Sequence, residues 1–190
     1  MTVKGKNLMT EKNTNTQIDD CYRMASDIAA ILISKGKTVS LAESITGGLI
    51  AKTFTDIPGS SKWFLSGIVS YNDEVKNRFL GVDRKVLKEH SAVSKECAEQ
   101  MAIGAIRLFE SSYSVAVTGY AGPEGEKVGE VYIATASNND INVKQFNYGS
   151  TPGRAEIREK VLFDALLMLY DFLKKDPDAG RYVEKKNFIS

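Results

Sequence analysis

The sequence predicts an α/β domain, and three observations support this fold class. Short apolar segments rich in β-branched residues alternate with longer segments whose apolar residues recur at intervals of three and four. Near residues 44 and 72, a predicted strand runs directly into a predicted helix. The chain of 190 residues is 43% apolar and 26% charged, which is typical of one compact soluble domain.

Composition and charge argue against several classes of function. The net charge is +1 with acids and bases intermingled, so the chain lacks the basic stripe of a nucleic-acid binder. No apolar run approaches the roughly 20 residues that cross a membrane, and the polar start lacks the apolar region of a signal peptide. Two cysteines and one histidine are too few for a metal cluster. We therefore expect a cytoplasmic protein that contacts neither nucleic acid nor membrane and uses no metal or cofactor.

The folded domain is expected over residues 17–174. Residues 1–16 are polar and without periodicity, and we interpret them as a flexible leader. Residues 17–35 present one apolar face, which predicts an amphipathic helix closed by Gly36. Residues 175–190 are charged and interrupted by proline and glycine, so they are interpreted as a tail without a catalytic role.

The segment LAESITGG, residues 41–48, is the predicted active centre. A strand over residues 38–42 is expected to turn into a helix that begins near Thr46. The turn contains a carboxylate, two hydroxyls and two glycines, namely Glu43, Ser44, Thr46, Gly47 and Gly48. Unpaired N–H groups at the first helical turn attract an anion or a developing oxyanion, so a nucleophile here would lie beside electrophilic groups. Ordinary N-capping by Ser44 or Thr46, with glycines for close packing, explains the same residues.

A second strand-to-helix junction follows. Residues 63–71 read as a buried strand, Asn72 as the N-cap of the next helix, and Gly81 as the end of that helix. Tyr71 at the strand end and Lys76 one turn into the helix are then expected at the same carboxyl-end edge of the sheet as Ser44, where α/β proteins bind ligands. A lysine that acts as general base needs a pKa lowered by burial. A solvated lysine on an amphipathic helix is the alternative.

A glycine-rich loop is the second candidate functional segment. After a helix that Ser94 is predicted to cap, residues 113–118 read as a buried strand that opens into the loop at residues 119–129. Its backbone N–H groups can form a concave anion or oxyanion site. A plain hairpin connection to a strand at residues 130–136 explains the loop equally well, with a further strand at residues 142–148.

Two arginines mark the start of the last helix. Arg154 and Arg158 stand four residues apart on one side of its first turns. This arrangement beside a helix N-terminus suits a phosphate group. Surface charge balanced by Glu156 and Glu159 is the alternative interpretation.

Several motifs in order resemble one known family. They read AESITGG, GSSKWF, GIVSYNDEVK, LGV, HSAVS, MAIGA, TGYAGPEG and VGEVYIA. Together they are similar to the nicotinamide-nucleotide amidase (NMN deamidase) family, the C-terminal domain of the competence/damage-inducible protein CinA, over residues 18–173. The resemblance implies a single three-layer α/β/α sandwich with a mixed central sheet. It also implies metal-free hydrolysis of nicotinamide mononucleotide (NMN) to nicotinate mononucleotide and ammonia. The family's other domain, a molybdopterin-binding-like module, has no room in this chain, so a stand-alone form is expected; homo-oligomer formation stays open.

The resemblance also implies roles for individual residues. Ser44 corresponds to the nucleophile and Lys76 to its general base, with Tyr71 orienting them or relaying a proton. The oxyanion and substrate contacts are expected from Glu43, Thr46, Gly47, Gly48, Thr118, Gly119, Ala121, Gly122, Arg154 and Arg158. In this scheme the arginines and the glycine-rich loop hold the 5′-phosphate of NMN.

The chain departs from the family pattern at three places. Ile45 stands where members commonly have cysteine, the glycine-rich loop is shorter, and GSTPGR replaces a segment that usually reads more like SGDR. A non-catalytic nucleotide-binding or regulatory module is therefore one rival function, and an amidase for another small carboxamide is a second. The combination of Ser44, Lys76 and Tyr71 with phosphate-suited arginines favours NMN.

Overall fold

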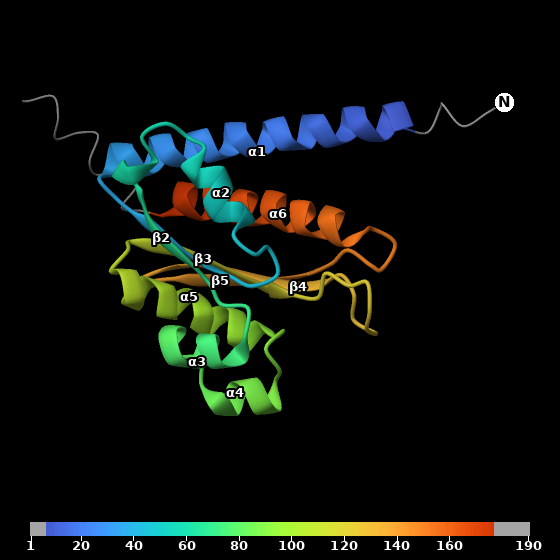
Figure 1. Cartoon of the computed structure of the whole chain (residues 1–190). Helices are drawn as coiled ribbons and strands as arrows, with labels where there is room; N and C mark the ends of the chain where they lie inside the picture. The colour runs from blue at the N-terminus through green and yellow to red at the C-terminus, as the bar shows by residue number, and fades with distance from the viewer. Residues whose placement is uncertain (1–6, 177–190) are drawn as a thin grey trace, which may run out of the picture.

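The fold is a sheet between two layers of helices (Figure 1). The computed structural model describes residues 7–176, with side chains described for residues 17–176. The expectations for residues 1–6 and 177–190 lie outside the described residues. In order across the sheet, the strands are β2 (Phe64–Val69), β1 (Val39–Glu43), β3 (Tyr113–Gly119), β4 (Glu130–Ser137) and β5 (Ile141–Asn147).

The sheet is mixed, as predicted. Strand β1 runs parallel to both β2 and β3, whereas β3–β4 and β4–β5 are antiparallel pairs. Parallel neighbours need a long crossover, and helices fill the connections around β1 and β2. The glycine-rich loop and the short turn after β4 instead reverse the chain directly. The carboxyl ends of β1, β2 and β3 therefore meet at one edge, where the helix-opening turns follow.

Three helices lie on each side of the sheet (Figure 1). On one side lie α1 (Asn7–Lys35), α2 (Leu49–Thr55) and α6 (Arg154–Lys175). A short 3-10 helix, η1 (Ser60–Lys62), follows α2 in the chain. On the other lie α3 (Asp73–Leu80), α4 (Arg84–Glu89) and α5 (Lys95–Phe109). The caps expected at Asn72, Ser94, Gly36 and Gly81 are all present: the two side chains accept helix amides, and both glycines have positive φ.

Small residues bring α5 close to the sheet and α3 close to α5. The core on the α5 side contains alanines from β1, β3, β4 and α5. A Cβ added at Gly104 of α5 would lie 2.0 Å from the backbone oxygen of Leu80, the last residue of α3. Glycine at this position therefore lets α3 pack directly on α5. This close approach fixes α3, and with it Lys76, beside the carboxyl end of the sheet.

Several element boundaries differ from the sequence prediction. Helix α1 begins at Asn7, within the segment interpreted as a leader. Residues 7–16 contain neither proline nor glycine, so a helix formed over residues 17–35 can extend through them. The apolar periodicity begins only at residue 17, so it predicted a shorter helix. Strand β2 is also shorter than predicted, because Trp63 belongs to the end of η1 and the strand stops at Val69.

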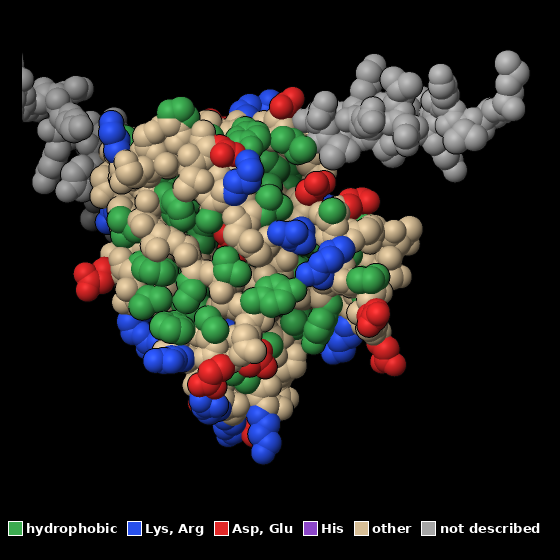
Figure 2. All heavy atoms as spheres, viewed as in Figure 1, with side chains coloured by type: hydrophobic (Ala, Val, Ile, Leu, Met, Phe, Trp, Pro, Cys, Tyr) green, Lys and Arg blue, Asp and Glu red, His purple; other side chains and the backbone are tan. Residues whose placement is uncertain are grey.

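The surface carries mixed charge and some exposed apolar side chains. Edge strand β2 leaves Leu65 and Val69 about half exposed, at 47% and 49%. Figure 2 shows apolar side chains gathered over the middle of one face, with acidic and basic side chains scattered around them. Among the described residues, no helix is long and apolar enough to cross a membrane.

Candidate active site

A cavity of about 220 Å³ lies at the carboxyl-end edge of the sheet. Its walls come from the turn after β1, the segment from the end of β2 into α3, the residues before α5, the end of β3 and the start of α6. The lining residues are Ser44, Ile45, Tyr71, Asp73, Lys76, Ala92, Val93, Thr118, Gly119, Tyr120, Ala121 and Arg154. The structure thus brings together residues from both strand-to-helix junctions and from the glycine-rich loop.

Ser44 and Lys76 form the centre of this cavity. The Nζ atom of Lys76 donates to the Oγ atom of Ser44 at 3.3 Å and to the backbone oxygen of Ser70 at 2.8 Å. Ser44 is 8% exposed and Lys76 only 2%, so both are withdrawn from bulk water. The alternative of a solvated surface lysine is therefore wrong. The reason is that α3 packs against α5 and directs Lys76 inward from its first turns.

Burial sets the protonation of this lysine. Loss of hydration lowers the pKa of Lys76 from its ordinary value. Negative charge on Cys97 would oppose this shift, but burial raises the pKa of the Cys97 thiol to about 11 and keeps it neutral near pH 7. Asp73, whose Oδ1 atom lies 3.9 Å from Nζ, is the nearby carboxylate that opposes it. A lysine with a lowered pKa beside a hydroxyl is suited to remove the hydroxyl proton.

Glu43 supports the turn at residues 44–48, which carries Ser44, from inside the protein. Its side chain is buried and accepts hydrogen bonds from the amides of Gly48 (2.9 Å), Ile50 (3.2 Å) and Ala51 (2.8 Å) at the start of α2. A buried carboxylate requires such donors, and the helix N-terminus supplies them. In the structure Glu43 and the Gly48 amide satisfy one another, and a contact of either with substrate stays a prediction.

The amides of Gly47 and Gly48, which were expected as oxyanion donors, already have acceptors within the protein. The Gly47 amide donates to the Ser44 backbone oxygen at 3.2 Å, so it is occupied like that of Gly48. Within residues 17–176, the amides of Ile45 and Thr46 make no hydrogen bond to protein. The Thr46 hydroxyl is buried and also lacks a partner among the described residues. Of these two residues, Ile45 lines the cavity, whereas Thr46 is fully buried and does not, so the Ile45 amide is the candidate oxyanion donor beside Ser44.

The two arginines have separate partners. Arg154 is exposed and donates to the Tyr71 hydroxyl at 2.8 Å and to the Gly122 backbone oxygen at 2.9 Å. Arg158 is partly buried and donates through Nε (3.2 Å) and Nη2 to the backbone oxygen of Thr46. The pair expected to share one phosphate is thus divided. Arg154 lies at the mouth of the cavity, whereas Arg158 binds the turn at residues 44–48 through Thr46.

Tyr71 lies at the cavity mouth rather than beside the Ser44–Lys76 pair. Its side chain is 61% exposed, and its hydroxyl accepts the hydrogen bond from Arg154. In the part of the chain that the structure describes, Tyr71 makes no hydrogen bond to Ser44 or Lys76. A proton relay through Tyr71 is therefore not assembled in this arrangement.

The glycine-rich loop contributes walls more than donors. Gly119 and Ala121 line the cavity, while the Thr118 hydroxyl donates to the backbone oxygen of Ala92 at 2.7 Å and fixes the segment before α5. A Cβ at Gly119 would lie 2.7 Å from the Val131 side chain, so glycine is needed for strand packing there.

The sequence reasoning missed Asp73 as a cavity residue, although its position one turn before Lys76 was a usable signal.

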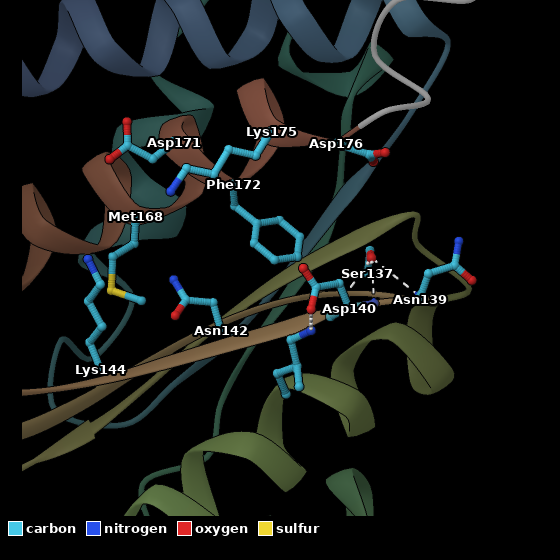
Figure 3. A pocket seen from close by; sticks show the side chains of 11 residues that line it. Ser137, Asn139, Asp140, Asn142, Lys144, Met168, Asp171, Phe172, Lys175 and Asp176 are labelled. Carbon is cyan, nitrogen blue, oxygen red and sulfur yellow. Dashed lines mark hydrogen bonds between the residues drawn. The ribbon is translucent and has the colours of Figure 1, made fainter.

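A larger cavity lies at the opposite end of the sheet. Figure 3 shows this space, of about 620 Å³, between the turn joining β4 to β5 and the last turns of α6. Its lining includes Met168 and Phe172 with the charged side chains of Asp140, Asp171 and Lys175. It contains no buried nucleophile and base, so its size does not make it the candidate site. No group of three or more potential metal ligands occurs among the described residues.

Comparisons with known proteins agree with this fold. The family model described as the CinA C-terminal domain matches residues 22–173. A CinA-like protein of Leptospira borgpetersenii is 44% identical over 153 residues, which are 78% of this chain and 36% of that protein. A CinA-like protein of Fervidobacterium nodosum is 41% identical over 160 residues, 82% of this chain and 38% of that protein. The chain thus spans little more than a third of the length of these curated relatives.

Solved structures give the same result. The competence/damage inducible protein CihA from Agrobacterium tumefaciens superposes with a TM-score of 0.79 at 40% identity, covering 82% of this chain and 96% of that one. The competence damage-inducible protein A (ComA) from Klebsiella pneumoniae gives a TM-score of 0.78 at 29% identity, covering 82% and 98%. With the ordered motifs and the α/β/α architecture, these matches show that the chain belongs to the CinA C-terminal domain family.

Proposed function

We propose that this protein is a serine amidase that converts NMN to nicotinate mononucleotide and ammonia. The observation that carries the proposal is the 3.3 Å contact between Lys76 Nζ and Ser44 Oγ, made by a lysine that is 2% exposed. Seryl–lysyl pairs are a known variant of the serine-nucleophile scheme and need no histidine. The resemblance to the NMN deamidase family supports the choice of substrate.

The first half-reaction forms an ester on Ser44. Neutral Lys76 accepts the hydroxyl proton as Ser44 Oγ attacks the carboxamide carbon, and the carbonyl electron pair moves onto oxygen. The Ile45 amide, at the cavity wall beside Ser44, stabilises that oxyanion. Collapse of the tetrahedral intermediate breaks the C–N bond, and the proton held by Lys76 passes to the departing nitrogen, which leaves as ammonia.

The second half-reaction restores the enzyme. Lys76, neutral again, takes a proton from a water molecule, whose oxygen attacks the ester carbon. Expulsion of Ser44 Oγ, which receives the proton from Lys76, releases the carboxylic acid. Each proton that Lys76 accepts is returned in the same half-reaction, so the lowered pKa serves both directions of transfer.

The size of NMN fits the cavity and the position of Arg154 at its mouth. A cavity of about 220 Å³ can take the pyridine ring and its carboxamide, while the ribose and phosphate extend through the mouth. Arg154 is exposed there, and its present acceptors are the Tyr71 hydroxyl and a backbone oxygen. A phosphate is a stronger acceptor for guanidinium than either, so Arg154 is the proposed 5′-phosphate ligand.

Ammonia release from NMN by the purified protein tests this function. We expect turnover of NMN that exceeds that of nicotinamide and glutamine, and loss of the signal in Ser44→Ala. Binding of NMN without ammonia release would instead support the non-catalytic module. Faster turnover of glutamine or another small amide would support a different amidase.

A further inference from the structure

Asp73 is the carboxylate that lines the active-site cavity. It occupies the first position of α3, its side chain is 61% exposed, and its Oδ1 atom lies 3.9 Å from Lys76 Nζ. Lys76 already has two hydrogen-bond acceptors, in Ser44 and Ser70, and must lose its charge to act as a base. Neither half-reaction of the proposed mechanism therefore requires the Asp73 carboxylate.

Two aromatic side chains line the cavity with this carboxylate. Tyr71 and Tyr120 both border the cavity and are 61% and 37% exposed. Aromatic faces and carboxylates both attract cations, and the attraction grows when a ligand displaces water. The cavity thus combines a nucleophile for carboxamides with groups suited to a delocalised positive charge.

We propose that Asp73, together with Tyr71 and Tyr120, selects carboxamides attached to a positively charged ring, of which a quaternary pyridinium is the example. This inference rests on the proposed amidase function and adds the charge of the substrate to it. In NMN the ring nitrogen is quaternary and lies meta to the carboxamide. When the carboxamide carbon is at Ser44, the positive ring therefore remains inside the cavity that Asp73 lines.

The same carboxylate acts on the general base in the opposite sense. The groups facing Lys76 are Asp73 from α3, Tyr71 from the segment after β2, and the neutral Cys97 thiol from α5. Of these, the Asp73 carboxylate holds the pKa of Lys76 higher than burial alone would. A bound pyridinium cation offsets that influence and favours neutral Lys76. A neutral carboxamide gives no such compensation.

The test compares substrates that differ in ring charge in Asp73→Asn and wild-type protein. NMN and nicotinamide riboside carry the positive ring, whereas nicotinamide and dihydro-NMN do not. We expect Asp73→Asn to raise the KM of the charged pair about 3- to 10-fold and to change the KM or inhibition constant of the neutral pair less than about twofold. For every substrate that is turned over, the rise of kcat/KM with pH should move to lower pH.

Glu74→Gln is the matched control. Glu74 lies in the same helical turn and is similarly exposed at 59%, but it pairs with Arg84 at 2.9 Å and does not line this cavity. Removal of its charge should leave the ratio of charged to neutral substrates unchanged. Asp73→Glu, which keeps the charge, should retain most of the selectivity.

The outcomes separate this inference from the proposed function. If the protein hydrolyses NMN but Asp73→Asn changes charged and neutral substrates equally, selection by ring charge is wrong and the amidase proposal stands. If Glu74→Gln shifts the ratio as much as Asp73→Asn, a diffuse field replaces the local contact and the assignment to Asp73 is wrong. If folded wild-type protein releases no ammonia from any carboxamide, both proposals are overturned.

Discussion

The active-site cavity has a buried half and an exposed half, and they differ in what fixes their side chains. Ser44, Lys76 and Glu43 are 8%, 2% and 1% exposed, and protein atoms hold each of them in place. Tyr71 and Asp73 are each 61% exposed, and Arg154 is also exposed. Burial perturbs pKa values and fixes geometry, as bond making requires, whereas exposed groups can exchange their partners for a ligand.

Because of this difference, substitutions can change the chemical step and substrate binding separately. Substitutions in the buried half are expected to lower kcat, because the reacting atoms lie there. Substitutions in the exposed half are expected to raise KM with less effect on kcat. The far cavity in Figure 3 is larger than the active-site cavity but has no comparable buried half.

The largest effect is expected for Ser44→Ala. In the proposed mechanism the hydroxyl forms the covalent bond but contributes little to the fold, so kcat should fall at least ~10³-fold with nearly unchanged thermal unfolding. Ammonia release from NMN measures the first quantity and calorimetry the second. Near-normal turnover by a folded variant free of contaminating enzyme would remove serine catalysis from the mechanism.

Lys76 should show a comparable loss with a distinct pH signature. In wild-type protein, kcat/KM should rise with pH as Lys76 loses its proton, with a midpoint below the ordinary lysine value of 10.5. Lys76→Arg should be inactive at every pH below 10, since guanidinium keeps its proton. Full activity of this variant would show that the lysine supplies only positive charge or packing.

Lys76→Met extends the same comparison to stability. Because burial lowers the pKa of Lys76, the unfolded chain binds more protons than the folded one between the two pKa values, and wild-type stability rises with pH across that interval. The inactive Lys76→Met protein should therefore be more stable than wild type near pH 7, by a margin that shrinks towards pH 10.5. Chemical denaturation at several pH values measures this margin; a margin independent of pH would contradict the lowered pKa.

Arg154→Ala tests the exposed half. Loss of one charge-assisted contact to the 5′-phosphate should weaken NMN binding by about 1.5 kcal/mol, or roughly tenfold in KM, with kcat little changed. Nicotinamide riboside lacks the phosphate, so its kinetics should be nearly the same in both proteins. An equal loss for both substrates would mean that Arg154 acts by holding Tyr71 and Gly122 instead.

The smallest effect on kcat/KM for NMN is expected for Arg158→Ala. This side chain donates twice to the Thr46 backbone oxygen and supports the buried half without lining the cavity. Its removal should lower the free energy of unfolding by about 1–3 kcal/mol and reduce kcat for NMN and the riboside alike. A loss confined to NMN would restore Arg158 as a phosphate ligand.

Local sequence pattern was sufficient for the α/β class and for most element positions. Apolar periodicity located the strands and helices, and Asn72, Ser94 and Gly81 marked helix ends that the structure confirms. Helix ends and strand-to-helix junctions depend on residues close together in the chain, so the sequence alone locates them. These junctions made Ser44 and Lys76 candidates, but the pattern left a solvated Lys76 open, and only the resemblance to the family implied its role as general base.

Only the tertiary structure decided which candidate side chains meet. Lys76 bonds to a residue 32 positions away, and Arg158 to one 112 positions away. On its own helix, a buried Lys76 has the same spacing as a solvated one, and Arg158 the same spacing as a phosphate ligand. What separates these cases is the packing of α3 on α5 and of α6 beside the Thr46 turn. That packing determines which lysine loses water and which backbone oxygen an arginine reaches, because desolvation and long-range hydrogen bonds depend on the assembled core.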